Sequence, residues 1–139
     1  MKKVLFSSQT QHWATPRELY AELDREFHFT FDPCPLGNVE APLFGEGGLS
    51  KTWNHERIYC NPPYGPGIRP FLEKACEADL AVFLLPARTD TRWFHEIALP
   101  HAREIRFLRG RLHFNGAGSA PFPSMIVIFR NETHEQLGP

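Results

Sequence analysis

The run Leu80-Ala81-Val82-Phe83-Leu84-Leu85 consists of six consecutive apolar residues, bounded by Asp79 and Pro86. A strand with one wet face alternates apolar and polar residues, whereas a strand covered on both faces is apolar throughout. The run therefore predicts a central strand of a parallel sheet, which needs helices on both faces. That requirement indicates the α/β class.

Helices and further strands are expected to alternate on either side of this run. Apolar residues at helical spacing predict a helix over about 16–26, with Thr15 as its N-cap and Pro16 as its first residue. Those apolar residues are Leu19, Tyr20, Leu23 and Phe27. The other predicted elements are helices over 70–78 and 91–98 and strands over 27–31, 57–60, 104–108 and 125–129. With the central run, the predicted sheet has about five strands.

Size and composition indicate one ordinary globular domain over residues 1–139, with 42% hydrophobic and 22% charged residues. Three cysteines without a C-x-x-C pair argue against a disulfide scaffold, and seven histidines without ligand spacing predict no metal site. The start, Met1-Lys2-Lys3-Val4-Leu5-Phe6, lacks the long apolar segment of a signal peptide. No apolar run is long enough to span a bilayer, so we expect a cytoplasmic protein without membrane contact.

The tetrapeptide Asn61-Pro62-Pro63-Tyr64 directly follows the predicted strand over 57–60, at the kind of strand end where α/β sheets bind ligands. Its residue types suit methylation of an exocyclic amine, whose nitrogen lone pair is delocalised into the ring of the base. The Asn61 oxygen and the Pro62 carbonyl can accept the two amine hydrogens, while Pro62 and Pro63 fix the backbone. Tyr64 offers a flat face for a base that has left the duplex. A proline-rich turn that merely ends the strand is the competing interpretation.

The net charge is −1, but residues 86–115 hold six arginines against three acidic residues, a local charge of +3. A confined surplus on a nearly neutral chain predicts one anion-binding face rather than a surface that coats a polyanion. The candidate DNA-binding residues in this segment are Arg88, Thr91, Arg92, Arg109 and Arg111. A solvated or salt-bridged face, neutralised in part by Asp90 and Glu104, is the alternative.

Taken together, the chain resembles the small phage-type DNA N6-adenine methyltransferases of the Dam family, from Trp13 to Arg130. The stretches that carry the resemblance are Trp13-Ala14-Thr15-Pro16, Phe31-Asp32-Pro33-Cys34, Tyr59-Cys60-Asn61-Pro62-Pro63-Tyr64, Leu85-Pro86-Ala87-Arg88-Thr89-Asp90-Thr91, Arg109-Gly110-Arg111-Leu112 and Ala120-Pro121-Phe122-Pro123-Ser124. The resemblance implies a reduced, Rossmann-like methyltransferase sheet in which the strands over 104–108 and 125–129 form an antiparallel pair. It also implies S-adenosylmethionine as methyl donor, adenine N6 in DNA as acceptor, and a bacterial host cell with a phage or prophage origin.

The same resemblance implies a cofactor site at the ends of the first two strands. Thr15 and Pro16 match an element that touches the methionine part of the cofactor, with Trp13 nearby. The other implied contacts are Asp32, which can bind the ammonium group, Pro33 and Asn61.

The chain departs from the family pattern where a Gly-x-Gly loop normally follows the first strand. Pro33-Cys34-Pro35-Leu36-Gly37 stands there instead, and about 24 residues before the next strand leave no room for two further βα units. Glu46 or the stretch Gly47-Gly48-Leu49 is the candidate for ribose binding. We expect Cys34 to be buried and inert rather than a nucleophile of the kind used to methylate a ring carbon.

Two alternatives to adenine methylation remain open at this point. The acceptor can be another amine, such as cytosine N4, RNA adenine or a protein glutamine amide, because all present an NH₂ group. The chain can also be a non-catalytic DNA-binding module that has lost cofactor binding. Since so short a chain has little room for a separate target-recognition domain, loose specificity and a homodimer are both options.

Overall fold

A computed structural model of the chain describes residues 13–35, 48–114 and 118–131. Its centre is a four-stranded sheet in the order β1-β2-β6-β3. The strands are β1 (Arg57–Cys60), β2 (Leu80–Pro86), β3 (Glu104–Phe107) and β6 (Ser124–Arg130). β1 and β2 are parallel, and β6 runs antiparallel to both β2 and β3, which confirms the antiparallel last pair. The chain is thus a mixed α/β protein whose sheet is compatible with a methyltransferase fold.

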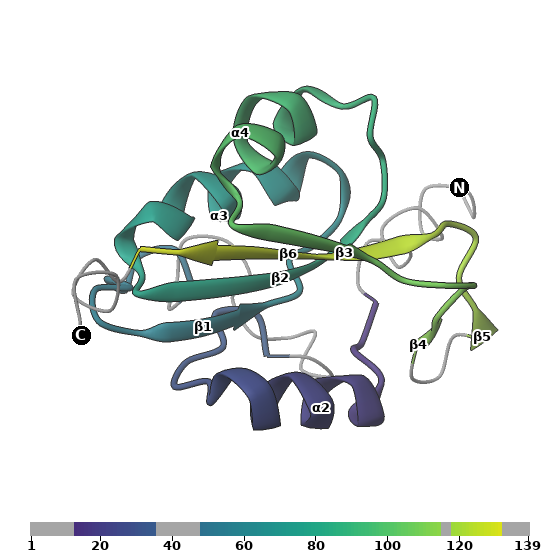
Figure 1. Ribbon diagram of the computed structural model, residues 1–139, viewed down its shortest axis with the longest axis horizontal. Helices are drawn as coiled ribbons and strands as arrows, with labels where there is room; N and C mark the ends of the chain where they lie inside the picture. The colour runs from purple at the N-terminus through teal and green to yellow at the C-terminus, as the bar shows by residue number, and fades with distance from the viewer. Residues whose placement is uncertain (1–12, 36–47, 115–117, 132–139) are drawn as a thin grey trace, which may run out of the picture.

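Helices cover both faces of this sheet, as the apolar run of β2 requires, and all seven residues of β2 are buried (Figure 1). Helix α2 (Arg17–Phe27) lies on one face. On the other face lie α3 (Ile68–Lys74) with the 3₁₀ turns η1 (Gly65–Gly67) and η2 (Ala75–Glu77), the π-helical turn η3 (Phe94–Ala98) and α4 (Leu99–His101). No helix in the described part of the chain is long and apolar enough to cross a membrane.

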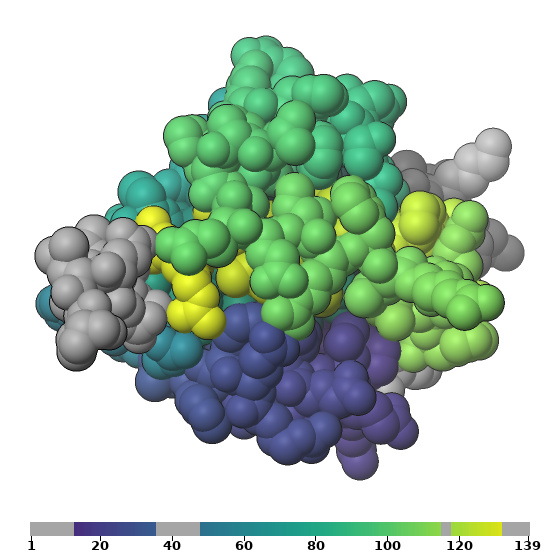
Figure 2. All heavy atoms as spheres, in the orientation of Figure 1, coloured from purple at the N-terminus to yellow at the C-terminus, as the bar shows by residue number. Residues whose placement is uncertain are grey.

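Because β3 runs parallel to β1 and β2, the carboxyl ends of these three strands lie at the same edge of the sheet. The start of β6 lies there too. We call this the carboxyl edge, and it is the right-hand side of Figure 1. The small hairpin of β4 (His113–Phe114) and β5 (Gly118–Ser119) projects beyond this edge. Figure 2 shows the light-green atoms of the hairpin gathered on this side of the molecule.

The strand predicted over 27–31 is wrong for most of its length. Phe27 is the last residue of α2, and His28 ends the helix in the left-handed region at φ 55°. The Asp24 carboxylate then accepts a hydrogen bond from the backbone N–H of Phe29 at 2.9 Å, which completes the helix end. Only Phe31 reaches the sheet, by one parallel bridge to Ile58, so the sheet has four full strands.

Candidate functional site

The Asn61 side chain is fixed at the end of β1 with its amide nitrogen bonded and its oxygen free. Nδ2 donates hydrogen bonds to the Trp13 carbonyl and, at 3.1 Å, to Thr15 Oγ1. Oδ1 is buried and has no hydrogen-bond partner among the described residues. A buried acceptor without a partner costs about 1–3 kcal/mol, so native sites that keep one usually have a use for it. The arrangement holds the amide rigidly and leaves its oxygen as a buried acceptor that no described residue uses.

Thr15 does not cap a helix, and that expectation is wrong. The residue before α2 is Pro16, and no side chain caps the helix there. The Thr15 hydroxyl instead lies 2.6 Å from the Tyr59 hydroxyl and 3.1 Å from Asn61 Nδ2. The N-terminal segment is therefore tied to the motif at the end of β1.

Tyr64 is almost fully buried and anchors the motif to the neighbouring strand. Its hydroxyl donates to the Leu84 carbonyl in β2 at 3.2 Å, and only 3% of the residue is exposed. Burial, and next the nearby Cys60, raise the pKa of the phenol. Pro62 and Pro63 are buried as well. The motif is thus a rigid part of the core at the carboxyl edge.

A cluster of aromatic rings surrounds the motif and joins segments that are far apart in the sequence. The Trp13 ring centre lies 5.4 Å from those of Phe114 and Phe122, and the Tyr64 ring centre lies 5.6 Å from that of Phe122. The Arg88 guanidinium lies 5.5 Å from the centre of the Phe122 ring. The rings bring together the N-terminal segment, the motif, the hairpin and the bend before β6. Sequence reasoning missed Phe114 and gave Phe122 no role, although Phe122 lies in one of the stretches that carry the resemblance.

Asp32 lies in the turn after the Phe31 bridge. Its Oδ1 accepts a hydrogen bond from the backbone N–H of Cys34 at 2.9 Å. Burial raises the pKa of this half-buried carboxyl to about 6, and the Cys34 N–H offsets only part of the effect. Cys34 is buried, as expected, and burial raises the pKa of the neighbouring thiol of Cys60 well above its ordinary value.

Gly48 packs directly against the turn that carries Asp32. A Cβ atom at Gly48 would lie 2.5 Å from the carbonyl oxygen of Pro33, which real side chains do not tolerate. The Trp53 indole donates to the Gly48 carbonyl at 3.0 Å and holds this approach. Close backbone approach is one of the properties that a Gly-x-Gly loop supplies. Two of the candidates for ribose binding, Glu46 and Gly47, lie outside the described residues, as does the segment 1–6.

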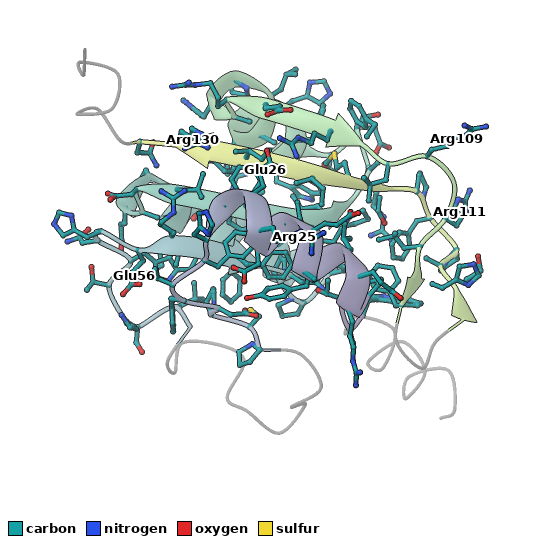
Figure 3. All side chains as sticks on the ribbon, turned by 60° about the horizontal axis from the view of Figure 1, so that its bottom comes forward. Arg25, Glu26, Glu56, Arg109, Arg111 and Arg130 are labelled. Carbon is teal, nitrogen blue, oxygen red and sulfur yellow. The ribbon has the colours of Figure 1, made fainter. Side chains whose placement is uncertain are left out.

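Three candidate arginines follow strands at the carboxyl edge. Arg88 comes after β2, while Arg109 and Arg111 lie between β3 and β4, and Figure 3 shows the last two beside the hairpin at one end of the molecule. None of the three has an ion pair within the described part of the chain, although Arg111 donates to the Ala120 carbonyl at 3.4 Å.

Other residues of the arginine-rich segment have partners within the fold. Arg92 pairs with Glu96 at 3.0 Å, and Arg106 pairs with Glu104 at 2.7 Å and with Glu26 at 2.6 Å. The Thr91 hydroxyl donates to the Arg88 carbonyl at 2.8 Å and accepts from the Phe94 N–H at 3.3 Å, so it caps the following turn. A salt-bridged face is thus correct for part of this segment only.

The chain matches a known protein family over nearly its whole length. A family model described as DNA N-6-adenine-methyltransferase (Dam) matches residues 4–137, nearly the whole chain, and confirms the resemblance. The description gives methylation of adenine N6 in DNA as the general activity of the family. No curated protein and no solved structure matches the chain.

Proposed function

We propose that this chain, which belongs to the DNA N-6-adenine-methyltransferase (Dam) family, transfers a methyl group from S-adenosylmethionine to N6 of adenine in DNA. The observation that carries the proposal is the Asn61 amide. Its nitrogen is held by the Trp13 carbonyl and Thr15 Oγ1, and its oxygen is buried without a partner among the described residues. An amino group that donates to this oxygen would satisfy it.

The protein acts by holding the amine in a reactive geometry. Asn61 Oδ1 accepts one N6 hydrogen and the Pro62 carbonyl accepts the other, which favours a pyramidal nitrogen with its lone pair directed away from these two acceptors. When bound, S-adenosylmethionine would supply an electrophilic methyl carbon and a sulfur that leaves with the electron pair of the carbon–sulfur bond. The nitrogen lone pair would then form the carbon–nitrogen bond, and one N6 proton would leave to water. Positioning in line is the main contribution that this site can make.

The residues beside Asn61 fit the methyl donor. A half-buried carboxylate with a pKa near 6 is poorly solvated, so an ammonium group at Asp32 would compensate for the lost water. Pro33 lies next to it in the same turn. Thr15 and Pro16, with the Trp13 ring, are proposed to contact the methionine part, and Thr15 already touches Asn61.

DNA is proposed to approach the carboxyl edge, where the motif, Arg88 and the hairpin lie. Arg88, Arg109 and Arg111 supply guanidinium groups without an ion pair among the described residues, which suits contacts to phosphates. The adenine must leave the stack to reach Asn61, at a cost of a few kcal/mol. Packing against the aromatic cluster at the motif would recover part of that cost, provided that the nearly buried ring of Tyr64 is uncovered when the base enters.

The test is methyl transfer to DNA with isotopically labelled S-adenosylmethionine, followed by mass analysis of the nucleosides. We expect N6-methyladenine from the wild type and none from Asn61→Ala. Asn54→Ala is the matched control, because Asn54 is exposed and lies in the turn before β1. Full activity of folded Asn61→Ala removes the catalytic assignment. Label in N4-methylcytosine, in RNA or in protein would change the acceptor, and no binding of the donor in calorimetry would favour a non-catalytic module.

A further inference from the structure

A cavity of about 460 Å³ adjoins the motif on the side of α3. It is lined by Gly65, Pro66, Arg69, Arg92 and Trp93. The first two residues directly follow Tyr64, Arg69 belongs to α3, and Arg92 and Trp93 precede the turn η3. The volume lies within the usual range for small-molecule pockets, roughly 300–1,000 Å³. No role in the proposed reaction accounts for this cavity.

The charged groups that line the cavity are both cations. Glu96 binds both guanidinium groups, Arg69 at 2.8 Å and Arg92 at 3.0 Å, and these contacts lower the pKa of its carboxyl. Yet Glu96 does not line this cavity. It lines a second one, of about 340 Å³, together with Leu72 and Ile97. Glu96 therefore holds the two guanidinium groups from outside the cavity. Together with Glu73 it balances their charge, so the lining offers guanidinium N–H donors rather than a net positive charge.

Each guanidinium keeps donors that the protein does not use. Arg69 donates from Nε to Glu73 at 3.0 Å and pairs through Nη2 with Glu96, whereas Arg92 is bonded through Nε alone. A guanidinium has five N–H donors, so both have N–H groups without a partner among the described residues. The planar fork of Arg69, held by two carboxylates, and the exposed fork of Arg92 both have N–H groups that match the oxygens of a phosphate. The largely buried Trp93 adds an apolar wall that suits a deoxyribose.

The position of the cavity limits which phosphate it can take. Gly65 comes four positions after Asn61, and a chain spans at most about 3.6 Å per residue, so the two Cα atoms lie within about 14 Å. That reach covers only a few nucleotides. We propose that this cavity binds a phosphodiester of the DNA strand that carries the target adenine, a few nucleotides from it at most. This inference rests on the proposed function, since it takes Asn61 as the place of the adenine.

The first test removes the two cations and measures DNA binding. Arg69→Gln combined with Arg92→Gln is expected to raise the Kd for a fluorescent 20-base-pair duplex about tenfold or more. The slope of log Kd against log salt should fall by about 1 for each phosphate that the protein no longer neutralises. Arg17→Gln combined with Arg25→Gln is the matched control, because it removes two exposed charges from α2 on the opposite face of the sheet. If both double variants bind alike, the proposal is wrong.

The second test locates the phosphate by neutralising one phosphate at a time with a methylphosphonate. Wild-type binding should weaken at one or two positions beside the methylated adenine, and the cavity double variant should show no further loss there. Equal losses in both proteins at every position would overturn the proposal. If the wild type methylates DNA and the cavity double variant binds DNA as tightly as the wild type, this inference alone is wrong. If binding is sensitive to methylphosphonates but the wild type transfers no methyl group, the proposed function is wrong instead.

Discussion

Replacing Thr15 by valine removes one hydroxyl group and leaves the shape of the side chain almost unchanged. In the wild type this hydroxyl lies 2.6 Å from the Tyr59 hydroxyl and 3.1 Å from Asn61 Nδ2. The substitution therefore tests whether the orientation of the Asn61 amide matters for methyl transfer. The Trp13 carbonyl still accepts a hydrogen bond from that amide in the variant.

Two energies follow from this geometry. Tyr59 is fully buried, so in the variant its hydroxyl is left without a hydrogen-bond partner among the described residues. We expect this loss to lower the free energy of unfolding by about 1–3 kcal/mol. The Asn61 amide nitrogen loses one of its two hydrogen bonds, each worth about 0.5–1.5 kcal/mol. This free energy corresponds to a decrease of roughly 2- to 13-fold in the ratio of correctly oriented to misoriented Asn61 amide. We therefore expect kcat for methylation to fall by about that factor.

Three variants separate stability from orientation. Thr15→Ser keeps the hydroxyl and should retain kcat. Tyr59→Phe removes the partner hydroxyl without touching the Asn61 contact, so it should retain kcat as well, whatever its stability. Only Thr15→Val should lower kcat, measured at a temperature where denaturant unfolding shows all three to be folded. Equal kcat for Thr15→Val and Thr15→Ser, or an equal loss in Tyr59→Phe, would refute the reasoning.

Three further perturbations test other parts of the site. The pKa of Asp32 is raised from 3.8 to about 6, so its ionisation destabilises the fold as the pH rises from about 4 to 6. The free energy of unfolding of Asp32→Asn should thus exceed that of the wild type by at most about 3 kcal/mol above pH 6, and should equal it below pH 4. A difference in stability that does not change with pH would contradict this. The variant should also bind S-adenosylmethionine more weakly in calorimetry. Tyr64→Phe should lose about 0.5–1.5 kcal/mol of unfolding free energy but keep its methylation activity, because it keeps the ring. Tyr64→Leu should lose methylation activity. Equal activities of the two variants would show that the ring takes no part in base binding. Arg109→Gln combined with Arg111→Gln should lower the slope of log Kd for DNA against log salt concentration by about 1 to 2. Arg25→Gln is the control and should leave the slope as in the wild type. An unchanged slope in the double variant would count against phosphate contacts by these two arginines.

Local pattern was enough to predict most of the scaffold. The apolar run of β2 indicated a strand covered on both faces, and the helical spacing before Phe27 indicated α2 to within one residue at each end. The pattern failed over 27–31, because apolar residues there suit a strand as well as a helix end. The helix ends here because His28 adopts the left-handed conformation and the Asp24 side chain accepts a hydrogen bond from the Phe29 N–H. Neither feature produces a periodic pattern in the sequence.

The residue types of the site were visible in the sequence, because Asn61-Pro62-Pro63-Tyr64 and the arginine surplus lie in short contiguous segments. Their partners were not, since those come from distant parts of the chain. Thr15 looked like a helix cap, yet its hydroxyl meets Asn61, 46 residues away. Phe122 contacts Trp13 and Tyr64 from the bend just before β6.

Spacing along a chain determines which face of a strand or helix a side chain occupies, so the class of fold and the residue types at the end of β1 could be inferred from the sequence alone. Whether the Asn61 oxygen is left free, or whether Glu96 lies beside a cavity or within it, depends on distances between elements that only packing sets. A hydrogen bond requires its two heavy atoms to lie about 3 Å apart. The pattern of residues along the chain does not determine distances between separate elements to that accuracy.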